Sequence, residues 1–281
     1  IKYGKGETSR INGQIRELLA LFRRSCYVGY TATPFANIFI DPDTDDEVKG
    51  QDLFPRHFIF GLDAPTNYFG ARKVFIDGIP DEDEERPAYI RYISDNGDVL
   101  PVKHKIDHAL ITLPESMLDA LRAFLVARVI RNVRGQANQH ASMLVNASRF
   151  TGIQGLIRNR LHQRLKEIED AVRVDGGRAD AAERNPEIEA IRRCWEEEYA
   201  DARATWDEVR EGLLPVIASA QVVAVNAASP AGLDYGGGGA GQTVIAVGGF
   251  SLSRGLTLEG LTISYFLRSS VMYATLMQMG R

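Results

Sequence analysis

The spacing of hydrophobic residues along this chain alternates between the period of a helix and the short apolar runs typical of buried strands. Helical spacing predicts helices that begin near Ile11, Thr112, Gly152 and Asn185, and a further helix at the end of the chain. Apolar runs predict strands at 26–30, 142–148, 222–226, 243–247 and 261–267. Strands that alternate with helices are typical of a parallel sheet, so the expected fold class is α/β.

Two of the predicted helices carry signals at their starts. Thr112 and Glu115 have the spacing of a capping box, and Asn185 followed by Pro186 has the pattern of an N-cap residue with proline in the first turn. From Ile188 to Leu213 the apolar residues are spaced alternately by three and four, as in a coiled-coil seam. We therefore expect one long helix there, which pairs with the preceding helix as an antiparallel hairpin.

Composition narrows the classes of function. The chain has 281 residues, of which 44% are hydrophobic and 25% charged, enough for one large core or two ordinary ones. Its net charge of -4 excludes a globally basic surface, so any surface for nucleic acid must be local. Cys26 and Cys194 form no disulfide framework or metal-binding spacing, which fits a cytoplasmic protein. No apolar run is long enough to predict a membrane span.

Two short motifs at predicted strand ends have the chemistry of ligand binding. Thr31 and Thr33 place two hydroxyls at the end of the 26–30 strand, where open α/β sheets bind ligands. Gly249 follows the 243–247 strand and would let the backbone approach a ligand closely. The residues after it add hydroxyl and guanidinium groups that bind phosphate: Ser253, Arg254, Gly255 and Thr257. Each motif alone is equally typical of an ordinary turn.

A third motif, with Gln278 and Arg281, lies on the last predicted helix. A guanidinium suits the charge that spreads over a phosphoryl group during transfer. The order of the three motifs resembles that of motifs three, five and six in superfamily-two helicases. More closely, the segments 29–37, 252–261 and 276–281 look like the Z1 domain family. Its members carry the name endonuclease and accompany helicase-type ATPase modules in bacterial restriction and defence systems.

The resemblance implies a RecA-like helicase architecture in three parts. Residues 1–50 would be the tail of a first RecA-like lobe and carry the Thr-Ala-Thr motif. Residues 51–140 would be an insertion or inter-lobe region, partly helical. Residues 141–281 would form the second lobe, a parallel sheet with the helical hairpin inserted at about 152–214.

The resemblance also implies roles for single residues. Arg281, with Arg254, would be catalytic, and Arg281 would reach the γ-phosphate of ATP across a cleft between lobes. Thr31 and Thr33 would couple the nucleotide site to movement of nucleic acid. The residues expected to contact nucleotide or strand backbone are Gly249, Ser253, Gly255, Thr257 and Gln278.

ATP with Mg²⁺ is the cofactor that this resemblance implies for a full-length protein. The glycines and lysine of 4–9 lack the spacing of a phosphate-binding loop, and no Asp-Glu box follows a strand before Thr31. The chain begins at Ile1 and ends at Arg281, which we interpret as a fragment. We therefore expect this chain alone to bind no cofactor and not to hydrolyse ATP.

DNA is the expected partner, with RNA as the alternative. Arg149 and Arg158 belong to a basic cluster near the start of the 152–172 helix, where contact with phosphate and a solvated helix face are equally good interpretations. A second hypothesis makes the lobe a degenerate interaction module, whose helical hairpin docks another subunit of a defence system.

A metal-dependent endonuclease is the third hypothesis. Such a site needs clustered carboxylates with a lysine, and the acidic runs 41–47 and 81–85 lack that arrangement. His104 and His108 are four residues apart, but no third ligand accompanies them. No metal site is therefore predicted.

Overall fold

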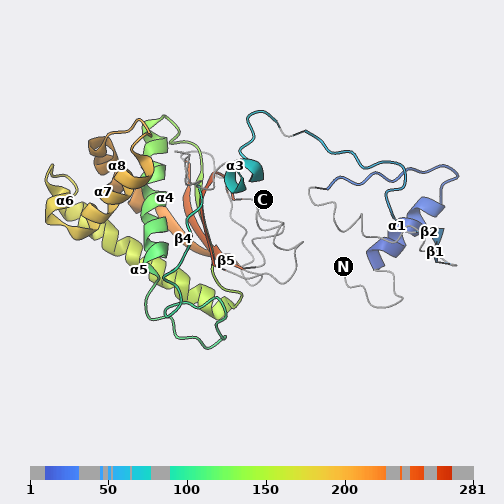
Figure 1. The fold of residues 1–281 in the computed structure, drawn as a ribbon, viewed down its shortest axis with the longest axis horizontal. Helices are drawn as coiled ribbons and strands as arrows, with labels where there is room; N and C mark the ends of the chain where they lie inside the picture. The colour runs from blue at the N-terminus through green and yellow to red at the C-terminus, as the bar shows by residue number, and fades with distance from the viewer. Residues whose placement is uncertain are drawn as a thin grey trace. The chain divides into compact units, whose positions relative to one another are not determined.

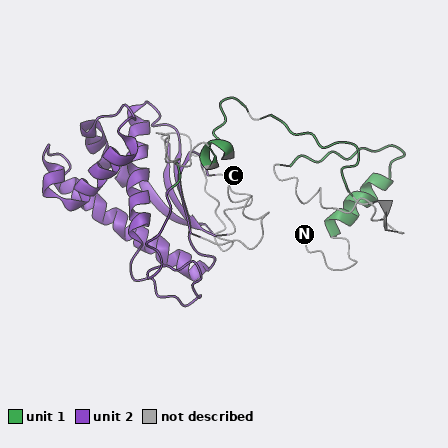
Figure 2. Ribbon diagram, viewed as in Figure 1, with its two compact units in different colours: residues 1–90, 271–281 green, residues 91–270 purple. Residues whose placement is uncertain are grey.

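A computed structural model describes residues 10–31, 45–46, 50–51, 53–63, 65–76, 89–225, 235, 241–249 and 258–267. The chain forms two compact units (Figure 2). Unit 1 comprises residues 1–90 and 271–281, and unit 2 comprises residues 91–270.

Unit 1 contains little regular structure among its described residues. Helix α1 (Arg10–Ala20) confirms the first predicted helix, and β1 (Asp45–Asp46) pairs antiparallel with β2 (Gly50–Gln51). A short helix, α3, spans Ala71–Phe75. The predicted strand at 26–30 is wrong, because these residues are irregular and exposed. A strand is stable only beside a pairing neighbour, and no described strand pairs with this segment.

Unit 2 is built on a four-stranded sheet whose strands are all parallel, which confirms the α/β class. The strands are β3 (Ala141–Asn146), β4 (Ala220–Val225), β5 (Thr243–Gly248) and β6 (Leu261–Phe266), close to the predicted ranges. Their order is β4-β5-β3-β6. All residues of β3 and β5 are buried, as expected for the central strands of a parallel sheet.

The connections of the two central strands run in opposite directions. From β3 the chain passes to β4 at one edge, and from β5 it passes to β6 at the other edge. In open α/β sheets a reversal of this kind marks the carboxyl ends of the adjacent strands as the place where ligands bind.

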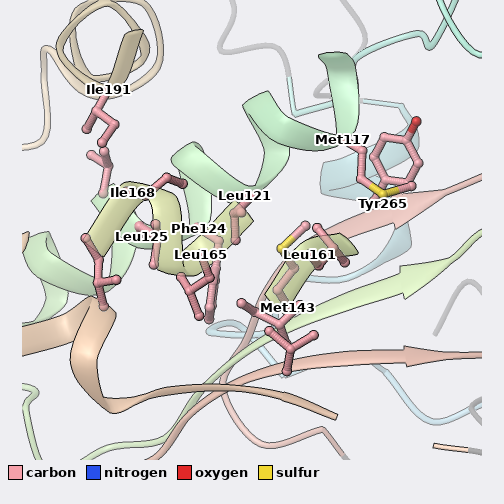
Figure 3. Close-up of a cluster of buried hydrophobic side chains, with 14 of the residues drawn as sticks. Met117, Leu121, Phe124, Leu125, Met143, Leu161, Leu165, Ile168, Ile191 and Tyr265 are labelled. Atoms are coloured by element: carbon pink, nitrogen blue, oxygen red, sulfur yellow. The ribbon is translucent and has the colours of Figure 1, made fainter. Parts of the chain in front are cut away.

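Helices α4 to α8 lie on one face of the sheet (Figure 1). They are α4 (Glu115–Val133), α5 (Thr151–Asp175), α6 (Ala181–Arg184), α7 (Pro186–Tyr199) and α8 (Trp206–Ser219). Figure 3 shows the core between α4, α5 and the sheet, where Phe124, Leu161 and Met143 meet. Full burial of each such side chain contributes about 1.5–3 kcal/mol to the free energy of unfolding.

The prediction of one long helix from Ile188 to Leu213 is wrong, because α7 ends at Tyr199 and α8 begins at Trp206. Thr205 accepts a hydrogen bond from the backbone N–H of Glu208, whose carboxylate accepts one from the backbone N–H of Thr205. This capping box starts a new helix. The helical region is therefore not a two-helix hairpin.

The starts of α4 and α7 test the two predicted caps. Asn185 caps α7 as expected, since its side chain accepts a hydrogen bond from Glu187 N–H at 3.0 Å. The box predicted for Thr112 and Glu115 does not form, because the N-cap residue of α4 is Pro114. Instead the Asp95 carboxylate accepts hydrogen bonds from the backbone N–H (2.8 Å) and the hydroxyl (2.6 Å) of Ser116.

Candidate functional site

The carboxyl ends of β3 and β5 meet closely. Gly249 directly follows β5, and Ser148, which is buried, lies two residues beyond the end of β3. A Cβ atom built on Gly249 would lie 3.1 Å from the carbonyl oxygen of Ser148 and 2.6 Å from Nε2 of Gln154 on α5. Because Gly249 has no side chain, the backbone after β5 approaches that after β3 closely, and a larger residue would require the Gln154 amide and the Ser148 carbonyl to shift.

Helix α5 starts at this junction with its first turn open. Its N-cap residue is Phe150, and no described side chain caps the helix. A Cβ atom built on Gly152 would meet nothing within 4 Å, so the backbone of this turn is accessible. The first N–H groups of a helix have no partner within the helix, and together with the helix dipole they favour an anion.

Gln154 places a buried polar side chain at the same junction. Its Nε2 donates to the carbonyl oxygen of Ser148 at 3.0 Å, and its side chain is 3% exposed. Its Oε1 is buried without a hydrogen-bond partner. A buried acceptor in this state costs about 1–3 kcal/mol of stability.

Two of the predicted nucleic-acid contacts lie on this segment. Arg149 is exposed, and its guanidinium carbon lies 4.7 Å from the centre of the Phe150 ring. Arg158 is exposed about 10 Å further along α5 and donates to the neighbouring Asn159 side chain at 2.8 Å. Neither arginine pairs with a carboxylate of the described part of the chain. Both charges are therefore available to phosphate.

His104 completes the junction from a loop that precedes α4. Its Nε2 lies 2.7 Å from the Ser148 hydroxyl, and its Nδ1 lies 2.7 Å from the carbonyl oxygen of Pro101. Sequence reasoning missed Ser148, Gln154 and His104. The place of Ser148 after a predicted strand is a signal that could have identified it, whereas the irregular loop of His104 offers none.

A second group of arginines has a structural role. Arg128 is buried and donates to the carbonyl oxygens of Ala137, Gln139 and Gly241. Arg131 donates to the carbonyl oxygen of His140 at 3.0 Å. These bonds lie at the amino ends of β3 and β5, so this pair of arginines supports the fold there, and Arg131 also lines a pocket with His140 and Glu259.

The structure brings together only part of the predicted site. Gly249 and Arg149 lie at the junction, and Arg158 lies further along α5. Thr31 belongs to unit 1, where it is exposed and follows no strand. The remaining predicted site residues lie outside the described residues: Thr33, Ser253, Arg254, Gly255, Thr257, Gln278 and Arg281.

Within the described ranges, no three His, Cys, Asp or Glu side chains gather in a group that could hold a metal ion. His104 and His108 pack as rings with centroids 5.8 Å apart, and each bonds to a backbone carbonyl oxygen. None of the described helices is long and apolar enough to cross a membrane.

Comparison with known proteins gives one match. The model of the Z1 domain family matches residues 116–281, more than half of the chain, and this range contains β3 to β6 with the junction residues Ser148, Gln154 and Gly249 but not His104. Neither the curated proteins nor the solved structures contain a match to this sequence. Because the family model matches more than half of the chain, including all four strands of the parallel sheet, the chain belongs to the Z1 domain family.

Proposed function

We propose that unit 2 is the second RecA-like lobe of a helicase-like ATPase that acts on DNA in a bacterial restriction, defence or repair system. The observation that carries this proposal is the contact of Gly249 with Ser148 and Gln154 beside the open start of α5. Membership of the Z1 domain family and the all-parallel sheet support it.

The junction has the chemistry of a site for a phosphodiester backbone. The first N–H groups of α5 donate to phosphate oxygens, and the Arg149 guanidinium supplies charge beside them. Arg158 extends the positive charge along the same helix. Contacts of this kind position a strand without reading its bases, as a motor that moves along DNA requires.

ATP with Mg²⁺ enters the proposal through the segment that follows Gly249. Ser253, Arg254 and Gly255 follow Gly249 within six residues of the sequence. Arg281 would stabilise the charge on the γ-phosphate, and a phosphate-binding loop on another lobe would hold the nucleotide. Family membership and the order of the motifs support this part of the proposal.

The proposal is tested by binding of a fluorescein-labelled single-stranded DNA oligonucleotide, followed by fluorescence anisotropy at low salt. We expect Arg149→Ala to weaken binding about tenfold, which is a typical effect of losing a charge-assisted contact to phosphate. Arg192→Ala is the matched control, because Arg192 is an exposed arginine on α7 that bonds only to Glu196 among the described residues. Equal affinities of the two variants for DNA would contradict the proposal. The same measurements with an RNA oligonucleotide test RNA as the alternative partner.

The hypothesis of a docking hairpin gains no support from the helices. Ile188, Ile191 and Leu213, which define the apolar seam, are fully buried in the core of unit 2. Docking of another subunit by this region remains a prediction. Because the apolar seam is buried, the other subunit would have to bind a different surface of helices α5 to α8.

A further inference from the structure

Arg149 stands between two residues that His104 contacts directly. On one side, the Ser148 hydroxyl lies 2.7 Å from Nε2 of His104. On the other side, the Phe150 ring packs edge-on against the imidazole, with centroids 5.8 Å apart. The same ring also contacts the Arg149 guanidinium, whose carbon lies 4.7 Å from the ring centre. The His104 imidazole thus contacts Ser148 and Phe150, the two residues on either side of Arg149.

The hydrogen bonds around His104 define which atom carries each proton. The Pro101 carbonyl can only accept, so Nδ1 of His104 must donate to it. In the neutral imidazole Nε2 is then an acceptor, and the Ser148 hydroxyl donates to it. The Ser148 oxygen in turn accepts a hydrogen bond from the backbone N–H of Phe150 at 3.1 Å. Each group in this series therefore donates to the next, from Phe150 N–H through the Ser148 hydroxyl and His104 to the Pro101 carbonyl oxygen.

A serine that donates to a histidine also resembles the start of a nucleophilic site. Ser148, however, is only 2% exposed, so a substrate cannot reach its oxygen. The hydroxyl is used twice, once as donor to His104 and once as acceptor from Phe150 N–H. Both bonds hold the backbone that leads into α5, so His104 and Ser148 position the start of that helix.

We propose that His104 is a positioning residue for phosphodiester binding, which holds Arg149 and the first turn of α5 in the conformation that receives the strand. This inference rests on the function proposed above, because it assigns the strand to the same junction. It adds a contribution from the loop before α4, a part of the chain that the Z1 family model does not include. The site is thus completed by a segment 44 residues before Ser148.

The test compares three variants of the 281-residue chain in the DNA-binding assay. His104→Phe keeps a ring against Phe150 but removes the acceptor, so we expect binding about three- to tenfold weaker, as for the loss of one hydrogen bond. His104→Gln keeps an acceptor near the place of Nε2, and we expect at least half of the lost affinity to return. His108→Phe is the control, because His108 bonds to the Val99 carbonyl and not to Ser148.

The readouts separate this inference from the proposed function. If the wild-type chain binds DNA and Arg149→Ala weakens binding, but His104→Phe binds as tightly as the wild type, the positioning role is wrong and the proposed function stands. If Arg149→Ala has no effect, the proposed function fails first. A similar loss for His104→Phe, His104→Gln and His108→Phe would indicate a general structural defect and would also overturn the positioning role.

Discussion

Arginines lie at both ends of the central strands β3 and β5, but their interactions differ between the two ends. At the amino ends, Arg128 and Arg131 are bonded to carbonyl oxygens of the loops that enter the strands. At the carboxyl ends, Arg149 lies over a ring, α5 begins without a side-chain cap, and Oε1 of Gln154 is buried without a partner. Buried atoms without a partner occur at both ends, since Nε of Arg128 and Oγ1 of Thr243 also lack one. The difference lies in the arginines: those at the amino ends bond to backbone carbonyl oxygens, which indicates a role in the fold, whereas Arg149 is exposed beside an uncapped helix start.

Electrostatics adds to this contrast. Burial lowers the pKa of Arg128, and the charge of Arg131 lowers it further, so no counter-charge compensates for the burial. Three carbonyl oxygens stabilise the guanidinium instead. Arg149 is exposed to solvent and does not need such compensation. An arginine that is hydrated and free of carboxylates binds phosphate at a smaller cost than one already engaged.

The largest expected effect separates the two ends by stability. Arg128→Ala leaves three carbonyl oxygens without their donor and should lower the free energy of unfolding by about 3 kcal/mol. Chemical denaturation measures this loss. The control is Arg134→Ala, since Arg134 is exposed and donates to one carbonyl oxygen, and its loss should cost less than about 1 kcal/mol. Equal free energies of unfolding for the two variants would contradict the structural role assigned to Arg128.

A pair of glycines sharpens the comparison. Gly260, near the amino ends, has φ 63°, and a Cβ atom there would lie 1.9 Å from the His140 carbonyl oxygen. Gly260→Ala should therefore destabilise by about 2 kcal/mol or more. Gly249→Ala meets the amide end of Gln154 first, so its stability loss should be smaller, about 1 kcal/mol, while DNA binding weakens. Thermal unfolding measures the stability of both variants, and fluorescence anisotropy measures their DNA binding. A larger stability loss for Gly249→Ala, or weaker DNA binding for Gly260→Ala than for Gly249→Ala, would contradict the roles assigned to the two ends.

The smallest effect concerns two helix starts, the capped one of α4 and the open one of α5. Burial raises the pKa of Asp95, but its hydrogen bonds from Ser116 outweigh that, so the pKa lies below its usual value. The carboxylate therefore stabilises the fold above its unfolded-state pKa, and this contribution is lost as the pH falls through the lowered pKa.

Asp95→Ala should cost about 1 kcal/mol at neutral pH, as the loss of a helix cap does. The difference from the wild type should shrink as the pH falls through the lowered pKa of Asp95, because the wild-type carboxylate then becomes protonated as well. Asp98→Ala, in the same loop, is the control and should leave stability unchanged. A difference between wild type and Asp95→Ala that stays constant as the pH falls from neutral through the lowered pKa of Asp95 would show that the carboxylate charge has no part in capping α4.

The sequence predicts the sheet well because β3 and β5 consist mainly of apolar residues and β6 alternates apolar residues with Thr262 and Ser264, all at the expected places. It fails between Tyr199 and Trp206, where the spacing of apolar residues continues in phase through a turn that only the capping box of Thr205 reveals. It also fails for the strand at 26–30, whose apolar residues have no described pairing partner.

The candidate site was predictable only where its residues follow a regular element. Gly249 follows a predicted strand, and Arg149 precedes a predicted helix, so both were found by their positions. His104 contributes through a contact that spans 44 residues from a loop without periodicity. Gln154 looked like an ordinary helical residue, because its significance lies in an oxygen that lacks a partner in the folded chain.

The most direct test of the central claim is the salt dependence of DNA binding. Each phosphate contact of a single strand contributes about 0.7 to the slope of log affinity against log salt concentration. We predict that the slope for Arg149→Ala is smaller than that of the wild type by about 0.7, while Arg192→Ala keeps the wild-type slope. Identical slopes for the wild type and Arg149→Ala would contradict the assignment of the carboxyl-end junction as the phosphate-binding site.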